Sequence, residues 1–150
     1  MQARLRLTDY CLAVWLASAP GWAQGLEYRS VAEQGAVMYA APMPQSKKLF
    51  LFSRFTPLEV VLIQSQWAKV RDMTGSMGWL PLGQLSPRRM VQVLARAEVR
   101  SAADEASAIV FAAERDVVLE LLESPRGPWA RVRHRDGRQG FIAISRIWGV

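Results

Sequence analysis

The sequence predicts an all-β protein made of two small barrels in tandem, placed after a segment that is removed on export. Three observations lead to this fold class. One pattern of tryptophans, glycines and apolar residues occurs twice, apolar residues alternate with charged ones, and turn signals separate the short runs. Neither copy has a convincing helical pattern after residue 23. We therefore divide the chain into a signal peptide at residues 1–23, a first barrel at 24–87 and a second barrel at 88–150.

Residues 1–23 have the organisation of a cleavable signal peptide. A short positive start precedes nine mostly apolar residues, Cys11 to Ala19, which are too few to span a bilayer as a helix. The small residues Gly21 and Ala23 predict cleavage before Gln24. The alternative is a membrane anchor that is never cut. The intact mass of the exported protein distinguishes the two, because an anchor would keep the segment from Met1 to Ala23.

Removal of this segment changes the composition of the chain. Its only cysteine, Cys11, leaves, so the mature chain has no thiol, disulfide or cysteine metal ligand. The formal charge falls from +6 to +5, because two arginines and one aspartate leave. This positive net charge favours anionic partners. The alternative is that the charge only keeps the protein soluble. Export argues against nucleic acid as the natural partner. No later segment has the roughly 18 apolar residues of a transmembrane helix, so we expect a soluble periplasmic or secreted protein.

The internal repeat is clearest in the second half of each copy. Trp67 and Trp129 each open a Trp-Ala-Lys/Arg-Val-Arg run, which is followed by a glycine–aromatic–aliphatic run. One constant offset in residue number relates all of these segments between the copies. Upstream, the apolar run at 58–64 matches 117–123 at an offset that is three positions smaller. This match implies three extra residues in the turn at 124–128, whose prolines and glycine are typical of a longer turn.

Short strands and turns follow one another along the second copy. Trp129 to Arg135 alternates apolar or small residues with charged ones, as in a strand with one buried face. Asp136-Gly137 is a tight-turn signal, and Gly140 to Ile144 is the returning strand. Ser145 to Trp148 is interpreted as a 3₁₀ turn and a last strand, and Ser101 to Phe111 as a loop that leads into a strand. Five antiparallel strands per copy predict a small barrel or sandwich.

These motifs resemble the bacterial SH3-like domain family in its tandem exported form. The matching Trp-x-x-Val and Gly-aromatic-aliphatic segments are residues 67–70, 129–132, 78–80 and 140–142. The resemblance covers roughly residues 27–150 and implies two SH3-like barrels. The openings at 38–42 and 99–103 lack the glycine of the family's opening motif. Because this loop borders the ligand groove in such folds, the ligand need not be the family's usual one.

Catalysis needs convergent side chains in set roles, and the sequence offers few of them. After residue 23 the chain has one histidine, His134, which we interpret as a loop residue beside a turn. A zinc site needs three or four ligands, and a catalytic triad needs a buried histidine beside a serine and a carboxylate. A glycine-rich phosphate loop is also missing from the sequence. We therefore predict no enzyme activity, no metal and no cofactor.

Three arginines are the first group of candidate ligand-binding residues. Arg131, Arg133 and Arg135 alternate along the predicted strand, so they are expected on one outward face. Such a ladder can bind carboxylates or phosphates. The alternative is that these residues belong to an edge strand, where their charge prevents pairing with the strands of other molecules.

Three aromatic residues form the second group of candidates. Tyr39, Trp67 and Trp129 are interpreted as the rim of a peptide groove, although small barrels also use aromatics in their cores. Trp79 and Phe141, between a glycine and an aliphatic residue, are expected in the cores.

Two classes of function fit these features. The leading hypothesis is an exported, non-catalytic binding module for a peptide or a component of the cell envelope, such as a peptidoglycan stem peptide or an envelope protein. The alternative is a periplasmic structural or assembly partner without affinity for the cell wall, which full burial of the groove tryptophans would favour. The short linker at 86–90 further predicts docked barrels, with apolar residues from Leu80 to Leu94 buried between them.

Overall fold

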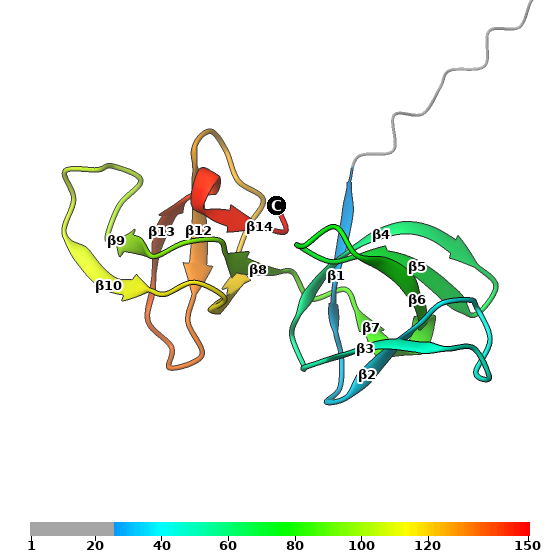
Figure 1. Ribbon diagram of the computed structural model, residues 1–150. Coiled ribbons are helices and arrows are strands. Elements are labelled where there is room, and N and C mark those ends of the chain that lie inside the picture. Colours follow the sequence, from blue (N-terminus) through cyan, green and yellow to red (C-terminus); the bar gives the residue numbers. More distant parts are fainter. Residues whose placement is uncertain (1–25) are drawn as a thin grey trace, which may run out of the picture.

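The computed structural model describes residues 26–150 as two β-barrels that lie side by side (Figure 1). The predicted signal peptide lies outside the described residues. Each barrel is one antiparallel sheet of seven strands, which confirms the predicted all-β fold of two barrels. The helical segments within residues 26–150 are two 3₁₀ turns. No helix in this part of the chain is long and apolar enough to cross a membrane.

Both barrels have the same strand order. The first has the order β3-β2-β6-β5-β4-β1-β7 and the second β10-β9-β13-β12-β11-β8-β14, so each strand's counterpart lies seven strands later. The first barrel contains β1 (Glu27–Val31), β2 (Ala36–Tyr39), β3 (Lys48–Phe52), β4 (Pro57–Gln64), β5 (Trp67–Arg71), β6 (Met77–Pro81), η1 (Leu82–Gln84) and β7 (Leu85–Ser86). The second contains β8 (Met90–Val93), β9 (Ala97–Arg100), β10 (Ile109–Ala113), β11 (Val118–Leu121), β12 (Trp129–Arg133), β13 (Gln139–Ala143), η2 (Ile144–Arg146) and β14 (Ile147–Trp148). Seven strands exceed the five expected, and β1 and β8 precede the repeat recognised in the sequence.

Strand pairing confirms one alignment of the repeat and corrects another. From β5 and β12 onward the offset between Trp67 and Trp129 holds through both hairpins. In the preceding strands, Glu59 pairs with Arg71 and Glu120 pairs with Arg133, so that the offset there is smaller by one position only. The predicted match of 58–64 with 117–123 is therefore wrong, because the whole segment between the paired glutamate and arginine is longer in the second barrel by one residue, not by three. The apolar run alone fits several strand registers. The pairing of a glutamate in β4 or β11 with an arginine in the next strand identifies the register that forms.

Each barrel has a separate core, built from the inward faces of its strands. Ala130 and Val132 of β12 are fully buried, as are their counterparts in β5, which confirms the alternation. The prediction that Trp79 and Phe141 are core residues is wrong, because both are half-buried. The residue that follows the aromatic one points inward instead: Leu80, next to Trp79, is fully buried.

Gly78 and Gly140 mark close approaches between neighbouring strands. A Cβ atom on Gly140 would lie 2.5 Å from the carbonyl oxygen of Arg100, and one on Gly78 would lie 2.9 Å from that of Tyr39. Real Cβ atoms do not come that close to backbone oxygens, so β13 can cross β9, and β6 can cross β2, only at glycine.

The barrels are docked through a small aromatic and polar joint, near which the C-terminus lies (Figure 1). The ring of Tyr28 in β1 meets that of Trp148 in β14 edge-on, with centroids 5.2 Å apart and planes at 83°. The guanidinium of Arg89 lies over the Tyr28 ring and donates a 3.0 Å hydrogen bond to the carbonyl of Gly149. The short linker and these cross-barrel contacts together agree with the predicted docking.

Most of the residues expected to fill this joint lie elsewhere. Leu85 belongs to the core of the first barrel, Val91 and Val93 belong to the core of the second, and Leu94 is exposed. Each buried member occupies an inward position on its own strand, so the joint is left to residues that alternate outward. Met90 is the exception, because it is buried outside both cores and lines the space between the barrels, so the predicted apolar layer is reduced to this one residue of the set.

Candidate functional site

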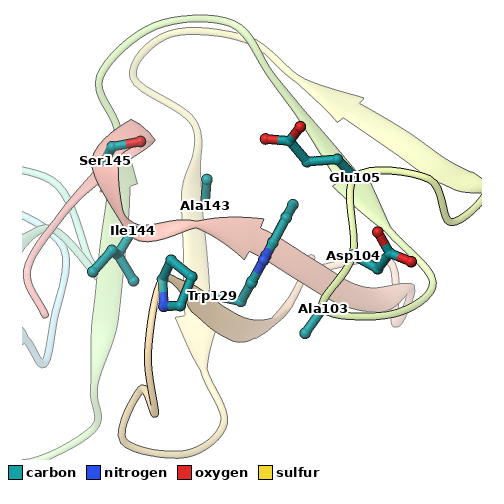
Figure 2. A pocket seen from close by; sticks show the side chains of 8 residues that line it. Ala103, Asp104, Glu105, Trp129, Ala143, Ile144 and Ser145 are labelled. Carbon is teal, nitrogen blue, oxygen red and sulfur yellow. The ribbon is translucent and has the colours of Figure 1, made fainter.

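Trp129 opens β12 and stands half-buried on the surface of the second barrel. Figure 2 shows its ring between the loop that carries Asp104 and Glu105 and the segment Ala143–Ser145. Together they line a hollow of about 470 Å³. The sequence predicted Trp129 as a rim residue of a peptide groove; the residue lies beside this hollow, and its contact with a ligand stays a prediction.

The loop beside Trp129 has a regular internal structure. The backbone N–H of Ala102 donates to Oγ of Ser107, whose hydroxyl in turn donates a 2.7 Å bond to the carbonyl of Asp104. The carboxylate of Asp104 accepts a 3.0 Å bond from the N–H of Ala106. These bonds are local side-chain-to-backbone bonds, which hold a turn without helix or sheet. They fix the loop so that its acidic residues border the hollow.

Two more hollows share Trp129. One, of about 460 Å³, is bordered by Arg96, Arg100 and Arg146 together with acidic residues, and the other, of about 280 Å³, by Arg131. The guanidinium of Arg100 donates a 2.8 Å bond to the carbonyl of Ser107 and pairs with Glu98. The indole therefore lies between acidic and basic side chains. Sequence reasoning singled out Arg131 but missed the other charged neighbours, and the loop predicted after residue 100 was the one signal that could have found the acidic ones.

The equivalent tryptophan of the first barrel has different surroundings. The ring of Tyr39 meets the ring of Trp67 edge-on, with centroids 5.6 Å apart and planes at 90°. The strand pairing makes Tyr39 the counterpart of Arg100, since the two pair with Trp79 and Phe141 respectively. The predicted candidates Tyr39 and Trp67 are thus brought together as a mutually packed pair.

The three candidate arginines do not form the expected ladder. Strand β12 ends at Arg133, and Arg135 lies in the following turn. Arg131 is exposed on the strand and donates a 3.3 Å bond to Gln139. The turn begins earlier than predicted because Asp136, with its left-handed neighbour Gly137 at φ 94°, closes the hairpin tightly.

Arg133 is engaged in an ion pair. Its guanidinium donates bonds of 3.0 and 2.7 Å to Glu120, which also accepts bonds of 3.0 and 2.9 Å from Arg88 of the linker. The hydrogen bond from Arg88 lowers the pKa of Glu120, burial opposes the shift, and the bond from Arg133 lowers the pKa further. Arg133 therefore has a structural partner that the sequence did not indicate.

His134 lies in the turn after β12, as expected, and its ring packs against Phe111 with centroids 5.6 Å apart. Its Nδ1 is 3.0 Å from a carboxylate oxygen of Asp136. Within residues 26–150, no three histidine, cysteine, aspartate or glutamate side chains are grouped so that they would hold a metal ion.

The match to known families now identifies the class of protein. Residues 32–87 and 94–149 each match the bacterial SH3 domain. Because these segments make up well over half of the chain, the protein belongs to the bacterial SH3 domain family and carries two such domains in tandem. The family resemblance in the sequence is confirmed.

Comparison with other proteins adds relatives of low identity. No curated protein matches. Similar solved structures include NlpC2 from Trichomonas vaginalis, with 14% identity, a TM-score of 0.38, and coverage of 83% of this chain and 48% of that chain. NlpC1 from Trichomonas vaginalis has 15% identity, a TM-score of 0.37, and coverage of 91% and 50%. An NlpC/P60 family protein from Bacillus cereus ATCC 10987 has 15% identity, a TM-score of 0.38, and coverage of 81% and 55%. The chain thus spans about half the length of each of these proteins.

Proposed function

We propose that this protein is an exported, non-catalytic binding module, and that the surface around Trp129 takes an extended peptide of the cell envelope, such as a peptidoglycan stem peptide. The observation that carries the proposal is that one half-buried indole is shared by three hollows. Aromatic side chains of this kind offer a large contact area for a peptide at little cost in conformational entropy. The step from fold to ligand is an analogy with other binding modules of this architecture.

The charges around Trp129 support a peptide that carries groups of both signs. Asp104 and Glu105 border one side of the indole, and Arg96 and Arg146 border another. A stem peptide offers amino groups and carboxylates within a short extended chain, and therefore complements such a surface. A uniformly acidic polymer would meet repulsion from the acidic loop.

Sedimentation with purified peptidoglycan tests this function. The native protein is expected to be enriched in the pellet over a heat-denatured control. Trp129→Ala should lower the bound fraction by about tenfold, since tryptophans at interfaces are frequent hot spots. Trp67→Ala is the matched control: it removes the same side chain at the equivalent strand start, where Tyr39 already packs on it, and should leave binding intact. Equal recovery of native and denatured protein would exclude affinity for the wall.

A second function, as a structural or assembly partner in the periplasm, is favoured by an apolar surface on the first barrel. Leu49, Phe50 and Leu51 are all exposed on β3, which is an edge strand of its sheet. Exposed apolar edge strands pair with strands of other chains. Crosslinking in intact cells tests this role. A crosslinked species that disappears in Phe50→Glu, in a protein that does not sediment with peptidoglycan, would support the assembly role over wall binding.

A further inference from the structure

A hollow of about 910 Å³ lies between the two barrels, and it exceeds each of the hollows that share Trp129. The first barrel contributes Arg54 and Phe55 from the turn before β4, the second contributes Val118 and Arg135, and the linker contributes Arg88. Its volume falls within the range of about 300–1,000 Å³ that is usual for ligand sites. We name this hollow the inter-barrel cleft.

Positive charge dominates the inter-barrel cleft. Four arginines, Arg54, Arg88, Arg133 and Arg135, line it together with a single carboxylate, that of Glu120. Glu120 is engaged by Arg88 and Arg133. Arg54 and Arg135 are exposed and have no carboxylate partner within residues 26–150. Their guanidiniums are therefore able to donate paired hydrogen bonds to the carboxylates of a ligand.

Phe55 occupies an unusual backbone position at the edge of this cleft. Its φ of 70° lies in the left-handed region, which bulky residues seldom adopt. The counterpart in the second barrel is Asp116, with φ 68° and the same backbone bond to the first strand, and aspartate tolerates this conformation far better. The Phe55 ring is half-buried, with the guanidinium carbons of Arg54 and Arg88 at 4.6 and 5.1 Å from its centre. Strain that is retained at a ligand-sized hollow indicates a functional role for the ring.

One part of the cleft wall is apolar. Val117 and Val118 are half-buried at the start of β11, and Met90 is buried beside them. An anion without apolar groups would meet the arginines but leave this wall and the Phe55 ring uncovered. A ligand that matches both features needs carboxylates and an apolar side chain within a few residues of each other.

We propose that the inter-barrel cleft binds an acidic peptide segment that carries a large apolar side chain. Carboxylates of the segment pair with Arg54 and Arg135, and the apolar side chain packs on Phe55 and Val118. Both barrels contribute to the site, so its shape depends on their docking. The site goes beyond the peptide surface at Trp129 and does not depend on that surface having a ligand.

Fluorescence anisotropy of the purified full protein with a fluorescein-labelled peptide of alternating glutamate and leucine tests the site. Saturable binding that weakens with added salt is expected. The double variant Arg54→Ala/Arg135→Ala should weaken binding by about tenfold or more. Its matched control is Lys47→Ala/Lys48→Ala, which removes the same charge from exposed positions outside the cleft and should bind as the parent does.

Phe55→Asn separates ligand contact from folding. Asparagine tolerates the left-handed conformation, so the melting temperature should be unchanged or higher, whereas binding should fall by about tenfold. Unchanged binding by Phe55→Asn would overturn the proposal, because the apolar contact would then be absent. Equal binding of a glutamate–serine peptide, or tighter binding of inorganic polyphosphate, would also overturn it, since charge alone would explain the affinity. Trp129→Ala should leave this binding unchanged, and a loss would place the probe at the other surface and overturn the assignment to the cleft.

Discussion

The two barrels share one strand order but present different side chains around their equivalent tryptophans. In the first barrel Tyr39 packs edge-on against Trp67. In the second barrel Arg100 takes that position and is directed to Ser107 and Glu98, so that Trp129 remains beside open hollows. The inward positions of the repeat are alike, whereas the outward positions differ. Duplication of a fold therefore does not duplicate the surface around an equivalent side chain.

The edge strands differ in the same manner. Phe50 in β3 is 54% exposed, whereas its counterpart Phe111 in β10 is 7% exposed. Phe111 is covered from the hairpin turn by the ring of His134 and the guanidinium of Arg138, which lies 4.8 Å from the ring centre. The long side chains of the turn between β12 and β13 thus bury Phe111, whereas Phe50 stays exposed in the first barrel. Both edge strands keep exposed aliphatic residues, Leu49 and Leu51 in β3 and Ile109 and Val110 in β10, but only the first also exposes an aromatic ring at this position.

The largest effect is expected where β13 crosses β9. Gly140→Val would place a Cβ atom 2.5 Å from a backbone oxygen, which cannot move without disturbing the strand. We expect a loss of roughly 3 kcal/mol or more in the free energy of unfolding, measured by urea denaturation. At Gly78 the corresponding backbone oxygen is 2.9 Å away and the nearest neighbour is a flexible side chain, that of Met38, so Gly78→Val should cost less. An unchanged urea midpoint for Gly140→Val would refute the close-approach explanation.

The joint between the barrels should show a smaller effect. Tyr28→Ala and Trp148→Ala each remove one ring of the edge-on pair. A double-mutant cycle is expected to give a coupling energy of about 0.5–1.5 kcal/mol in thermal or urea unfolding. Tyr39→Ala with Trp67→Ala is the matched cycle, since it tests an edge-on pair that lies within one barrel. Additive effects at Tyr28 and Trp148 would mean that the barrels are not held by this contact.

The ion pairs at Glu120 should affect the acid side of the stability profile. Because its pKa is lowered from the usual 4.5, the carboxylate stabilises the fold above about pH 4.5, and this contribution is lost as the pH falls through the lower folded pKa. Glu120→Gln should therefore be less stable than the parent at neutral pH, with a difference that shrinks on acidification. Melting curves between pH 7 and pH 2 measure it, and a difference that stayed constant over that range would contradict the expectation.

The smallest effect on stability is expected from exchanging the residues beside the tryptophans. Arg100→Tyr places the first barrel's residue next to Trp129, where the ring would cover the indole. The melting temperature should change little because Arg100 is only half-buried and lies outside the core of the second barrel, while sedimentation with peptidoglycan should fall by about fivefold. Tyr39→Arg is the reciprocal variant, and it should uncover Trp67. If Arg100→Tyr binds peptidoglycan as well as the parent, a tyrosine beside the tryptophan is not what separates the first barrel from the second in binding.

Much of the fold was predictable because alternation and turn residues act locally. The Trp-x-x-Val strands place Ala130 and Val132 inward whatever the rest of the barrel does, and Gly137 allows the left-handed turn that joins β12 to β13. The register of β4 was not predictable in this way. Its apolar residues fit several alignments, and the choice depends on Glu59 meeting Arg71 on the next strand.

The candidate site was predictable in part. Trp129 was recognised from its place in the repeat, because a residue at a strand start lies near the loops. Its charged neighbours come from three other segments, and only the folded barrel brings them together. The inter-barrel cleft was out of reach of the sequence, since the linker residue Arg88 and the turn residue Phe55 acquire a common surface only when two finished barrels dock.

The pairing of each barrel's first strand with its last has a consequence for synthesis. Strand β1 bonds to both β4 and β7, and β8 bonds to both β11 and β14. During emergence of the chain, the first barrel cannot close before Ser86 is released, while the second waits for Trp148. The first barrel is thus complete while much of the second is still being made. Because Trp148 also supplies the ring that meets Tyr28, closure of the second barrel and docking onto the first depend on the same late residue.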